Sequence, residues 1–402
     1  MMTFRKLAAN SDGKLIRAYM TEHAPDPEPD AHLEAGAKPD HTGRLTSYYT
    51  GRDSRASWRQ DMAPEAAAAL GIDPTKIPTN SELDRLFEAR RADTGEHWPS
   101  AKKREISAYD LTVAPHKSVS LAAEFAQSPA EAAAIREAIR RANDDTMRYV
   151  AREIGWARKS RNGEDGADPG EVGWVSFFFH HTARPTLQVK DGPSGVTYLA
   201  EVPLSGDPHD HIHNSMFNMV VTESGRIGSL DTKRLQNRIH EFGAYFQAQL
   251  ATRLREIGVR TEYDAKEEAF VLPAVPQAEV DLFSKGRKHT EQNAKAFAKS
   301  QGLDWFDLTA ERKFGLLSAA AVAERRSKST AHTEKQGWDE QADGIGWKHT
   351  TVLEDAKAPV LTDAERFDRA YQFAARHIAD EFHTAAVIDH DKLRTWACLV
   401  PG

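Results

Sequence analysis

The sequence predicts an α+β protein: one sheet with long helices packed on it, and a helical C-terminal part. Three short segments rich in β-branched and aromatic residues read as strands, Ile106–Val113, Gly173–His180 and Ile212–Val221. Two long segments, Ser128–Trp156 and Thr232–Ile257, repeat apolar residues at intervals of three and four, which is the period of an amphipathic helix. Strands and long helices in one chain favour a helix-covered sheet.

The first long helix has a clear start signal. Ser128 is a hydroxyl cap, Pro129 occupies the first helical position, and Glu131 is placed to complete a capping box. The second carries its apolar stripe on Leu235, Ile239, Phe242, Phe246, Leu250 and Leu254. Shorter helices are expected near Asn80–Arg91, Ala278–Ser300, Thr309–Arg325 and Asp363–Phe382.

The segment Gly173–His180 is apolar at successive positions, so both faces of the strand should be covered, as in the centre of a sheet. A further strand pair is expected around Arg260–Tyr263 and Ala269–Leu272. The segment Ala24–Gly43 contains four prolines and mixed charge, and it predicts an excursion or flexible loop.

Composition limits the classes of protein. A chain of 402 residues can form one large or two ordinary domains with a sizeable core. Its single cysteine, Cys398, cannot pair within the chain, and no window approaches the ~18 uncharged apolar residues of a membrane span. We therefore expect a soluble, cytoplasmic protein with no membrane insertion. No P-loop of the form GxxxxGK[ST] is visible, so ATP hydrolysis has no recognisable site.

The net charge of -7 gives no global reason to expect nucleic acid, so any DNA contact must come from local basic patches. For each such patch, a solvated helix end or loop is the favoured reading before other observations are added. The candidates are Arg90-Arg91, Lys102-Lys103-Arg104, Arg158-Lys159-Ser160-Arg161, Lys285-Gly286-Arg287-Lys288 and Arg325-Arg326.

The most informative stretch runs from Asp207 to Asn214 and reads DPHDHIHN. If it is a strand, His211 and His213 point to the same face and could together bind a divalent metal. His180 ends an apolar strand, where a polar residue needs a reason, and it is the candidate third ligand. Imidazole ligands suit Zn, Mn, Ni, Cu or Co, and an open site could also take Mg. The alternative is that these histidines are satisfied core or surface residues.

Two further residues could take part in the same site. Asp110 is the one acidic residue in its predicted strand, where it is either structural or a functional base that fixes a histidine tautomer or deprotonates a nucleophile. Lys117 begins a helix after a turn, a place suited to a phosphate contact, although an ordinary exposed lysine is as good a reading.

These motifs together resemble the MobF-type conjugative relaxases, the F-plasmid-like branch of the HUH endonucleases. The stretch from Asp207 to His213 is similar to the family's three-histidine motif, and His180-His-Thr-Ala-Arg184 to the segment that supplies its first histidine. The stretch that begins at Asp110 and includes Lys117 resembles the family's strand and turn, and Tyr48-Tyr49 its tyrosine region. The matches follow the family's order over roughly the first 260 residues.

The resemblance implies an antiparallel sheet of the HUH type and a strand-transfer reaction at a plasmid origin of transfer. A tyrosine attacks the scissile phosphate and forms a 5′-phosphotyrosine, assisted by a divalent metal, with Mg or Mn favoured, on His180, His211 and His213. The candidate DNA contacts are Lys117, Arg184 and the basic patch of Lys102, Lys103 and Arg104. It also implies single-stranded DNA, accessory relaxosome proteins and a type IV secretion coupling protein as partners, and translocation with the DNA to a recipient cell.

The sequence departs from the family's pattern at the nucleophile. The family usually carries two tyrosine pairs near its N-terminus, whereas Tyr19 here has no tyrosine neighbour and Tyr48-Tyr49 follow the proline-rich segment. By order along the chain, Tyr19 is the expected first nucleophile, with Tyr48 or Tyr49 in a second role. A packed aromatic is the alternative for Tyr19. A second difference is that family members usually continue into a C-terminal helicase, for which this sequence shows no P-loop. We expect residues 1–300 to form the relaxase domain and residues 301–402 to form a helical lid or the start of a linker to an absent helicase. The chain would then be either a trimmed or a naturally short form.

Two other functions use the same residues. A histidine–metal phosphodiesterase would use water as its nucleophile and need no tyrosine. A non-catalytic DNA-binding module would keep the histidines for structure alone. Trp58, Phe87 and Trp98 are candidate base-stacking residues, although such residues more often lie in a core.

Overall fold

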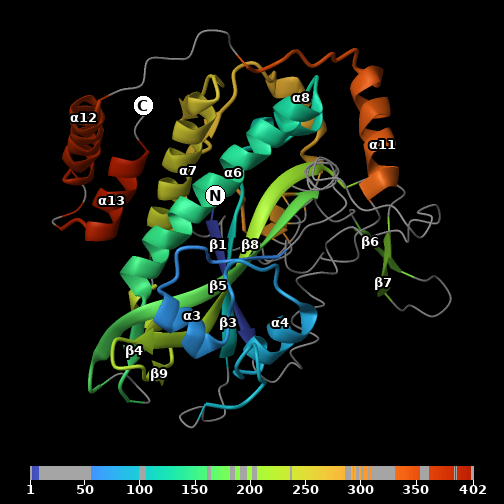
Figure 1. Cartoon of the computed structure of the whole chain (residues 1–402). Coiled ribbons are helices and arrows are strands. Elements are labelled where there is room, and N and C mark those ends of the chain that lie inside the picture. Colours follow the sequence, from blue (N-terminus) through green and yellow to red (C-terminus); the bar gives the residue numbers. More distant parts are fainter. Residues whose placement is uncertain are drawn as a thin grey trace, which may run out of the picture.

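Figure 1 shows the computed structural model of the chain. The part that it describes comprises residues 2–8, 56–98, 106–160, 164–181, 186–190, 197–201, 206–235, 238–285, 291–292, 294–295, 298–299, 303–306, 308, 331–353, 362–383, 385 and 387–399. The expected loop at 24–43 and helix at 309–325 lie outside these residues.

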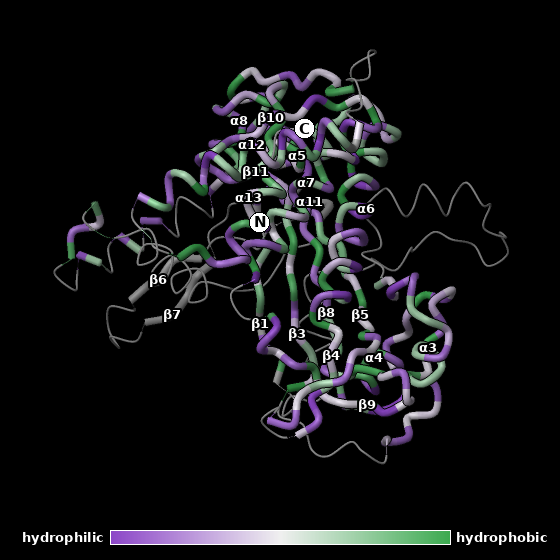
Figure 2. The backbone as a smooth tube through the Cα atoms, turned by 90° about the vertical axis from the view of Figure 1, so that its left-hand side faces the viewer, coloured by the Kyte–Doolittle hydropathy of each residue, from purple (hydrophilic) through white to green (hydrophobic). Residues whose placement is uncertain are grey.

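The centre of the molecule is an antiparallel sheet in the order β1-β3-β8-β5-β2, which confirms the predicted α+β class. Its strands are β1 (Met2–Ala8), β3 (Ile106–Val113), β8 (Pro208–Thr222), β5 (Ala167–His181) and the short β2 (Ser57–Trp58). In Figure 2, strands β1, β3, β8 and β5 run side by side through the middle of the molecule. The two long strands, β5 and β8, are neighbours, as expected for the most apolar segments of the sequence.

One face of the sheet is covered by the two long helices, α6 (Pro129–Ile154) and α7 (Ile239–Glu256) (Figure 1). The predicted cap of α6 is present, since the Ser128 hydroxyl accepts a hydrogen bond from the Glu131 amide. The second half of the capping box differs from the prediction. The Glu131 carboxylate accepts hydrogen bonds from Gln127 N, Thr351 Oγ1 and Val352 N, so it ties a distant segment to the start of the helix.

The other face is covered by the short helices α3 (Pro64–Leu70) and α4 (Asn80–Phe87). Trp58, Phe87 and Trp98 belong to the core on this side and are at most 9% exposed. The structure therefore excludes these three rings as platforms for DNA bases, because a base cannot stack on a ring that the core already covers.

The remaining elements surround this framework. A 3-10 turn covers Thr232–Arg234, and an isolated antiparallel strand pair, β6 and β7, lies between His180 and His211 in the sequence. The other elements are β4 (Trp156–Arg158), β6 (Thr186–Lys190), β7 (Thr197–Glu201), β9 (Ile227–Gly228), β10 (Glu262–Asp264), β11 (Ala269–Val271), α5 (Lys117–Glu124), α8 (Gln277–Leu282), α11 (Ala331–Gly344), α12 (Asp363–Glu381) and α13 (His390–Cys398). The predicted pair around 260–272 and the helix at 363–382 are thus confirmed.

Three predicted helices have different bounds. The helix expected from Thr232 begins at Ile239. Leu235 lies in a turn before the helix and packs in the core, so its spacing from the apolar residues of α7 resembles that of a helical residue. The helix expected to reach Arg91 ends at Phe87, and Ala89 follows with φ +56°, a left-handed conformation that stops a helix. The helix expected from Ala278 is interrupted after Leu282.

Residues from the C-terminal part enter the same core as the sheet. Trp338 is 3% exposed, and its indole N–H donates to the carbonyl oxygen of Gly206, 2.6 Å away. Val352 also belongs to this core. The expected boundary at residue 300 stays a prediction. Among the described residues, no helix is long and apolar enough to cross a bilayer.

Candidate active site

The two histidines of the HxH motif lie on one face of β8, as predicted. His213 pairs in register with Thr112 on β3 and Phe177 on β5, and His211 pairs with Phe179. Because Phe177 and Phe179 belong to the core beneath α3 and α4, the two imidazoles face that side of the sheet. Their ring centroids are 5.3 Å apart, and both side chains are largely buried.

Asp110 on β3 holds the His213 ring. Nδ1–H of His213 donates to the Asp110 carboxylate, 2.9 Å away, and the Thr112 hydroxyl oxygen lies 3.0 Å from the same nitrogen. Asp110 is 2% exposed. A carboxylate at Nδ1 fixes the tautomer that leaves the lone pair on Nε2, the arrangement usual around a metal-bound histidine.

The His211 ring is held by its own strand. Its Nδ1–H donates to the carbonyl oxygen of His209, 2.8 Å away, and the rings of His209 and His211 stack with centroids 5.3 Å apart. The backbone carbonyl of His209 therefore orients the His211 ring. Thr112 was not identifiable from sequence, because its contact with His213 depends on the register of β3 against β8.

His180 is directed elsewhere. Its ring packs on Phe178, which contacts the core under α6, and its Nδ1–H donates to Asp210, 2.5 Å away. Asp210 in turn faces α5 and α6: its amide donates to the Ser120 hydroxyl, and its carboxylate lies 3.5 Å from Nε of Arg136. A break in register between Phe179 and His181 accompanies this arrangement.

The three predicted ligands are thus only partly assembled. His211 and His213 meet on one face, while His180 pairs with Asp210, and the described residues contain no set of three His, Cys, Asp or Glu side chains close enough to hold a metal ion. The donor chemistry does fit a metal, because each of the three rings has its Nδ1 engaged by an oxygen acceptor.

Lys117 is not available as the predicted surface contact for a phosphate. Its ammonium donates to the carbonyl oxygen of Pro208, 2.7 Å away, at the start of β8. Burial lowers the pKa of Lys117 to about 8, an effect that the nearby carboxylate of Asp207 opposes. Asp207 is itself paired with Lys285, 2.6 Å away. Lys117 contacts the first residue of β8 directly, and Lys285 contacts the residue before it. Both lysines therefore hold the start of the strand that carries His211 and His213.

The other predicted site residues cannot be placed. Tyr19, Tyr48, Tyr49, Lys102, Lys103, Arg104 and Arg184 all lie outside the described residues. Their roles stay predictions.

Comparison with known proteins identifies the family and supports the fold. The family model described as TrwC relaxase matches residues 15–345. A solved structure of the conjugative relaxase TrwC with oriT DNA, in a metal-bound form, is 18% identical, with a TM-score of 0.59 over 87% of this chain and 100% of that chain. A copper-bound TrwC complex is 20% identical, with a TM-score of 0.60, and a complex with a 27-mer DNA that comprises the recognition hairpin and cleavage site is 20% identical, with a TM-score of 0.56. Each covers the same shares of the two chains. The search of curated proteins finds no match.

A helix-covered antiparallel sheet with a histidine pair, one ring of which is held by a carboxylate, together with these matches, defines the class as a DNA nicking and joining enzyme. The chain belongs to the TrwC relaxase family and is a MobF-type conjugative relaxase. Relaxases nick DNA at an origin of transfer, so the water-using phosphodiesterase is not favoured.

Proposed function

We propose that this relaxase nicks one strand of an origin of transfer by direct attack of a tyrosine hydroxyl on the scissile phosphorus. The new bond joins the tyrosine oxygen to phosphorus, the bond from phosphorus to the 3′-oxygen breaks, and that oxygen takes up a proton. The Asp110–His213 hydrogen bond carries this proposal, because a histidine fixed in one tautomer beside a second histidine suits a site where charge develops on a phosphate. Rejoining is the reverse reaction, so the covalent link conserves the bond energy.

We assign the divalent metal to His180, His211 and His213, with Mg or Mn as the expected ion and Zn, Ni, Cu or Co as alternatives. When bound, such an ion polarises a phosphate oxygen and offsets the charge that builds up on it. His211 and His213 already lie side by side. His180 is the second-last residue of the neighbouring strand β5, and its Nδ1 is held by Asp210, which leaves metal ligation to Nε2.

The protein's own groups have separate tasks. Asp110 and Thr112 hold the ring of His213, which favours the orienting role of Asp110 over direct deprotonation of the nucleophile. Tyr19 is the proposed first nucleophile, with Tyr48 or Tyr49 acting second. A tyrosine needs such a site because its free pKa is about 10.

The proposed partner is single-stranded DNA, contacted through Lys102, Lys103, Arg104 and Arg184. By family resemblance, accessory relaxosome proteins and a type IV secretion coupling protein complete the assembly. The proposed location is the bacterial cytoplasm, with transfer of the protein alongside the DNA.

The reaction class is tested on a denaturing gel. The protein is incubated with Mg or Mn and a single-stranded oligonucleotide that spans the origin of transfer of its own replicon, as wild type, as Tyr19→Phe and as a Tyr48→Phe/Tyr49→Phe double variant. We expect a shifted, protease-sensitive band that disappears only in Tyr19→Phe. Loss only in the double variant moves the nucleophile to the later pair, and cleavage with no covalent band in any protein overturns tyrosine attack.

The metal ligands are tested separately by calorimetric titration with Mn²⁺ in the absence of DNA. Single alanine variants of His180, His211 and His213 should each weaken metal binding, whereas an alanine at the exposed His240 of α7 should not. An unchanged affinity in His180→Ala would remove that residue from the proposed ligand set, since the structure itself places it next to Asp210.

A further inference from the structure

A buried polar network crosses three strands directly behind the histidine pair. The side-chain amides of Asn143 on α6 and Asn214 on β8 exchange two hydrogen bonds, of 2.8 and 3.1 Å. Asn214 also donates to the carbonyl oxygen of Leu111 on β3, 3.0 Å away, and accepts from the hydroxyl of Ser176 on β5, 2.7 Å away. Both asparagines are 0% exposed. The side chain of Asn214 therefore bonds to both neighbouring strands and to the covering helix.

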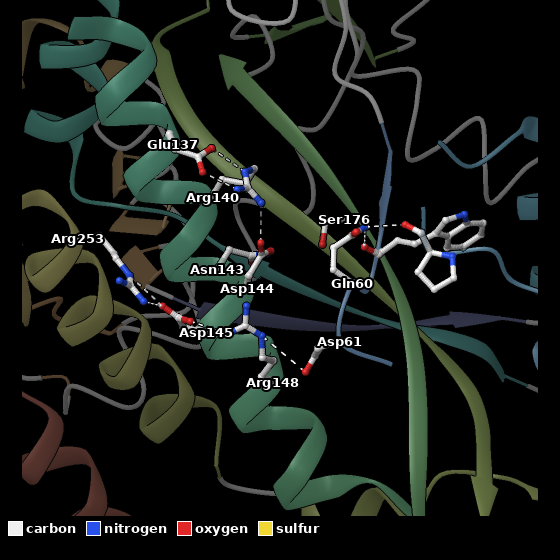
Figure 3. Close-up of polar contacts among 12 residues, drawn as sticks. Gln60, Asp61, Glu137, Arg140, Asn143, Asp144, Asp145, Arg148, Ser176 and Arg253 are labelled. Atoms are coloured by element: carbon white, nitrogen blue, oxygen red, sulfur yellow. Dashed lines mark hydrogen bonds and ion pairs between the residues drawn. The ribbon is translucent and has the colours of Figure 1, made fainter. Parts of the chain in front are cut away.

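These contacts follow a single rung of the sheet. Asn214 pairs in register with Leu111 on one side and with Ser176 on the other. Asn143 lies on α6 and Ser176 lies on β5 of the sheet that α6 covers. Figure 3 labels both side chains. The network lies on the face away from His213, because consecutive side chains of a strand alternate.

The apolar pattern cannot fix the register of these strands by itself. Phe177 and Phe179 face one core, while Trp174 and Phe178 contact the other, and β8 is likewise buried on both faces along most of its length. A strand with apolar residues on both faces loses little hydrophobic burial when it slips by one position. Such a slip would nevertheless turn every side chain to the opposite face, and it would carry His211 and His213 away from the site.

We propose that Asn143, Asn214 and Ser176 are positioning residues that fix the register of β8 against β3 and β5, and thereby set His213 against Asp110. Displacement of Asn214 from its rung would leave up to four buried hydrogen-bonding groups without partners, which is a larger penalty than any shift in apolar contacts. A buried asparagine pair that specifies one register is known from coiled coils. The inference rests on the proposed function only where its test measures metal binding.

The bond that Asn214 makes to Leu111 shows how the register reaches the site. Leu111 lies between Asp110 and Thr112, the two residues whose side chains meet Nδ1 of His213. Asn214 is the next residue after His213. The hydrogen bond between Asn214 and Leu111 thus fixes the backbone beside both partners of the Asp110–His213 hydrogen bond, although neither asparagine contacts the imidazole.

The test replaces the network by apolar groups of similar size, in the triple variant Asn143→Leu/Asn214→Leu/Ser176→Ala. Removing the three polar side chains together leaves only the carbonyl oxygen of Leu111 without its side-chain donor, so the melting temperature should fall only slightly. Mn²⁺ affinity in the absence of DNA should fall at least about tenfold, the scale of an outer-shell change. Hydrogen–deuterium exchange should rise in peptides that cover residues 106–113 and 208–222.

Thr146→Val is the matched control. Thr146 is 0% exposed on the same helix, three residues from Asn143, and its hydroxyl donates only within the helix, to Ala142. This variant should lose some stability but keep the metal affinity and the protection of both strands. A triple variant with wild-type metal affinity and wild-type exchange overturns the inference. If the wild-type protein binds no Mn²⁺, the proposed metal site fails, and the exchange of β3 and β8 alone decides the question of register.

Discussion

The Asp110 carboxylate and Nδ1 of His213 lie 2.9 Å apart, although 103 positions separate the two residues in the sequence. The contact arises because β3 and β8 pair antiparallel, with Asp110 opposite Ser215 and Thr112 opposite His213. The carboxylate therefore reaches diagonally along the strand to the ring of the second HxH histidine. This contact orients His213, one of the three proposed metal ligands.

Replacement of Asp110 by Asn tests what this carboxylate does. The variant keeps the shape of the side chain but removes the charge that fixes the His213 tautomer, so Mn²⁺ affinity should fall about 10–100-fold. Nicking at saturating metal should recover much of its rate. Titration calorimetry and the oligonucleotide gel measure the two effects independently.

Thr112→Val is the control for the Asp110 variant, because it removes the neighbouring hydroxyl and leaves the carboxylate in place. It should weaken metal binding less than Asp110→Asn. If Asp110→Asn instead binds metal normally and loses nicking at every metal concentration, the carboxylate deprotonates the nucleophile and does not orient His213.

The lowered pKa of Lys117 predicts a pH dependence of stability. Burial holds the pKa at about 8, below the value of 10.5 for the free side chain. Between these two values the unfolded chain binds more protons than the folded chain, so the Lys117 contribution to the free energy of unfolding rises with pH across that window. The stability gap between Lys117→Met and wild type should change in favour of wild type by at most about 3 kcal/mol from pH 7 to 10.5.

Urea unfolding at several pH values measures this change. Lys76→Met provides the contrast, because Lys76 is exposed and a hydrogen bond to Asp73 raises its pKa, so any effect should be small and of opposite sign. Parallel stability profiles for Lys117→Met and wild type would show that the ammonium carries no desolvation cost.

The strands were predictable where composition alone marked them. Ile106–Val113 has the same bounds in sequence and structure, because most of its residues are apolar, aromatic or β-branched and Asp110 is its only charged residue. The edge strand Met2–Ala8 was not predicted, since Arg5 and Lys6 interrupt its apolar pattern and its pairing with β3 is a long-range contact. Local spacing also misplaced the start of α7, where Leu235 packs in the core without being helical.

The site was predictable only within one strand. The period of two places His211 and His213 on one face without knowledge of the neighbouring strands. The position of His180 depends on the break in register between Phe179 and His181, which no residue count can show. Asp210 was visible inside the motif, but its role follows from Arg136 and Ser120, which reach it from helices far away in sequence.

The Glu131 carboxylate should stabilise the attachment of residues 351–352 to the start of α6. Its Oε1 accepts hydrogen bonds from Thr351 Oγ1 and Val352 N, 2.8 and 2.9 Å away, and the residue is 3% exposed. Glu131→Ala should lower the free energy of unfolding by about 3 kcal/mol, because buried donors lose a charged acceptor. Ser128→Ala removes only the helix cap and should cost about 1 kcal/mol. Equal losses in the two variants would mean that the carboxylate acts only at the helix end.

Two arginines share the carboxylates of Glu153 and Glu241, and their different burial predicts different costs. Arg238 forms a two-bond pair with Glu241, at 2.7 and 2.9 Å, and its side chain is 12% exposed. Arg394 on α13 reaches Glu153 at 2.9 Å and Glu241 at 3.3 Å, and its side chain is 36% exposed.

Glu241 is fully buried and also accepts a hydrogen bond from the Tyr149 hydroxyl. Arg238→Ala would leave this charge without its main partner and should cost about 3–5 kcal/mol in urea unfolding. Arg394→Ala should cost less than about 1 kcal/mol, as expected for a solvent-screened pair, but should increase the hydrogen exchange of α13. Arg238→Lys should recover only part of the loss, because an ammonium cannot make the two parallel bonds. A loss in Arg394→Ala as large as that in Arg238→Ala would show that α13 is part of the stabilising core of the relaxase fold.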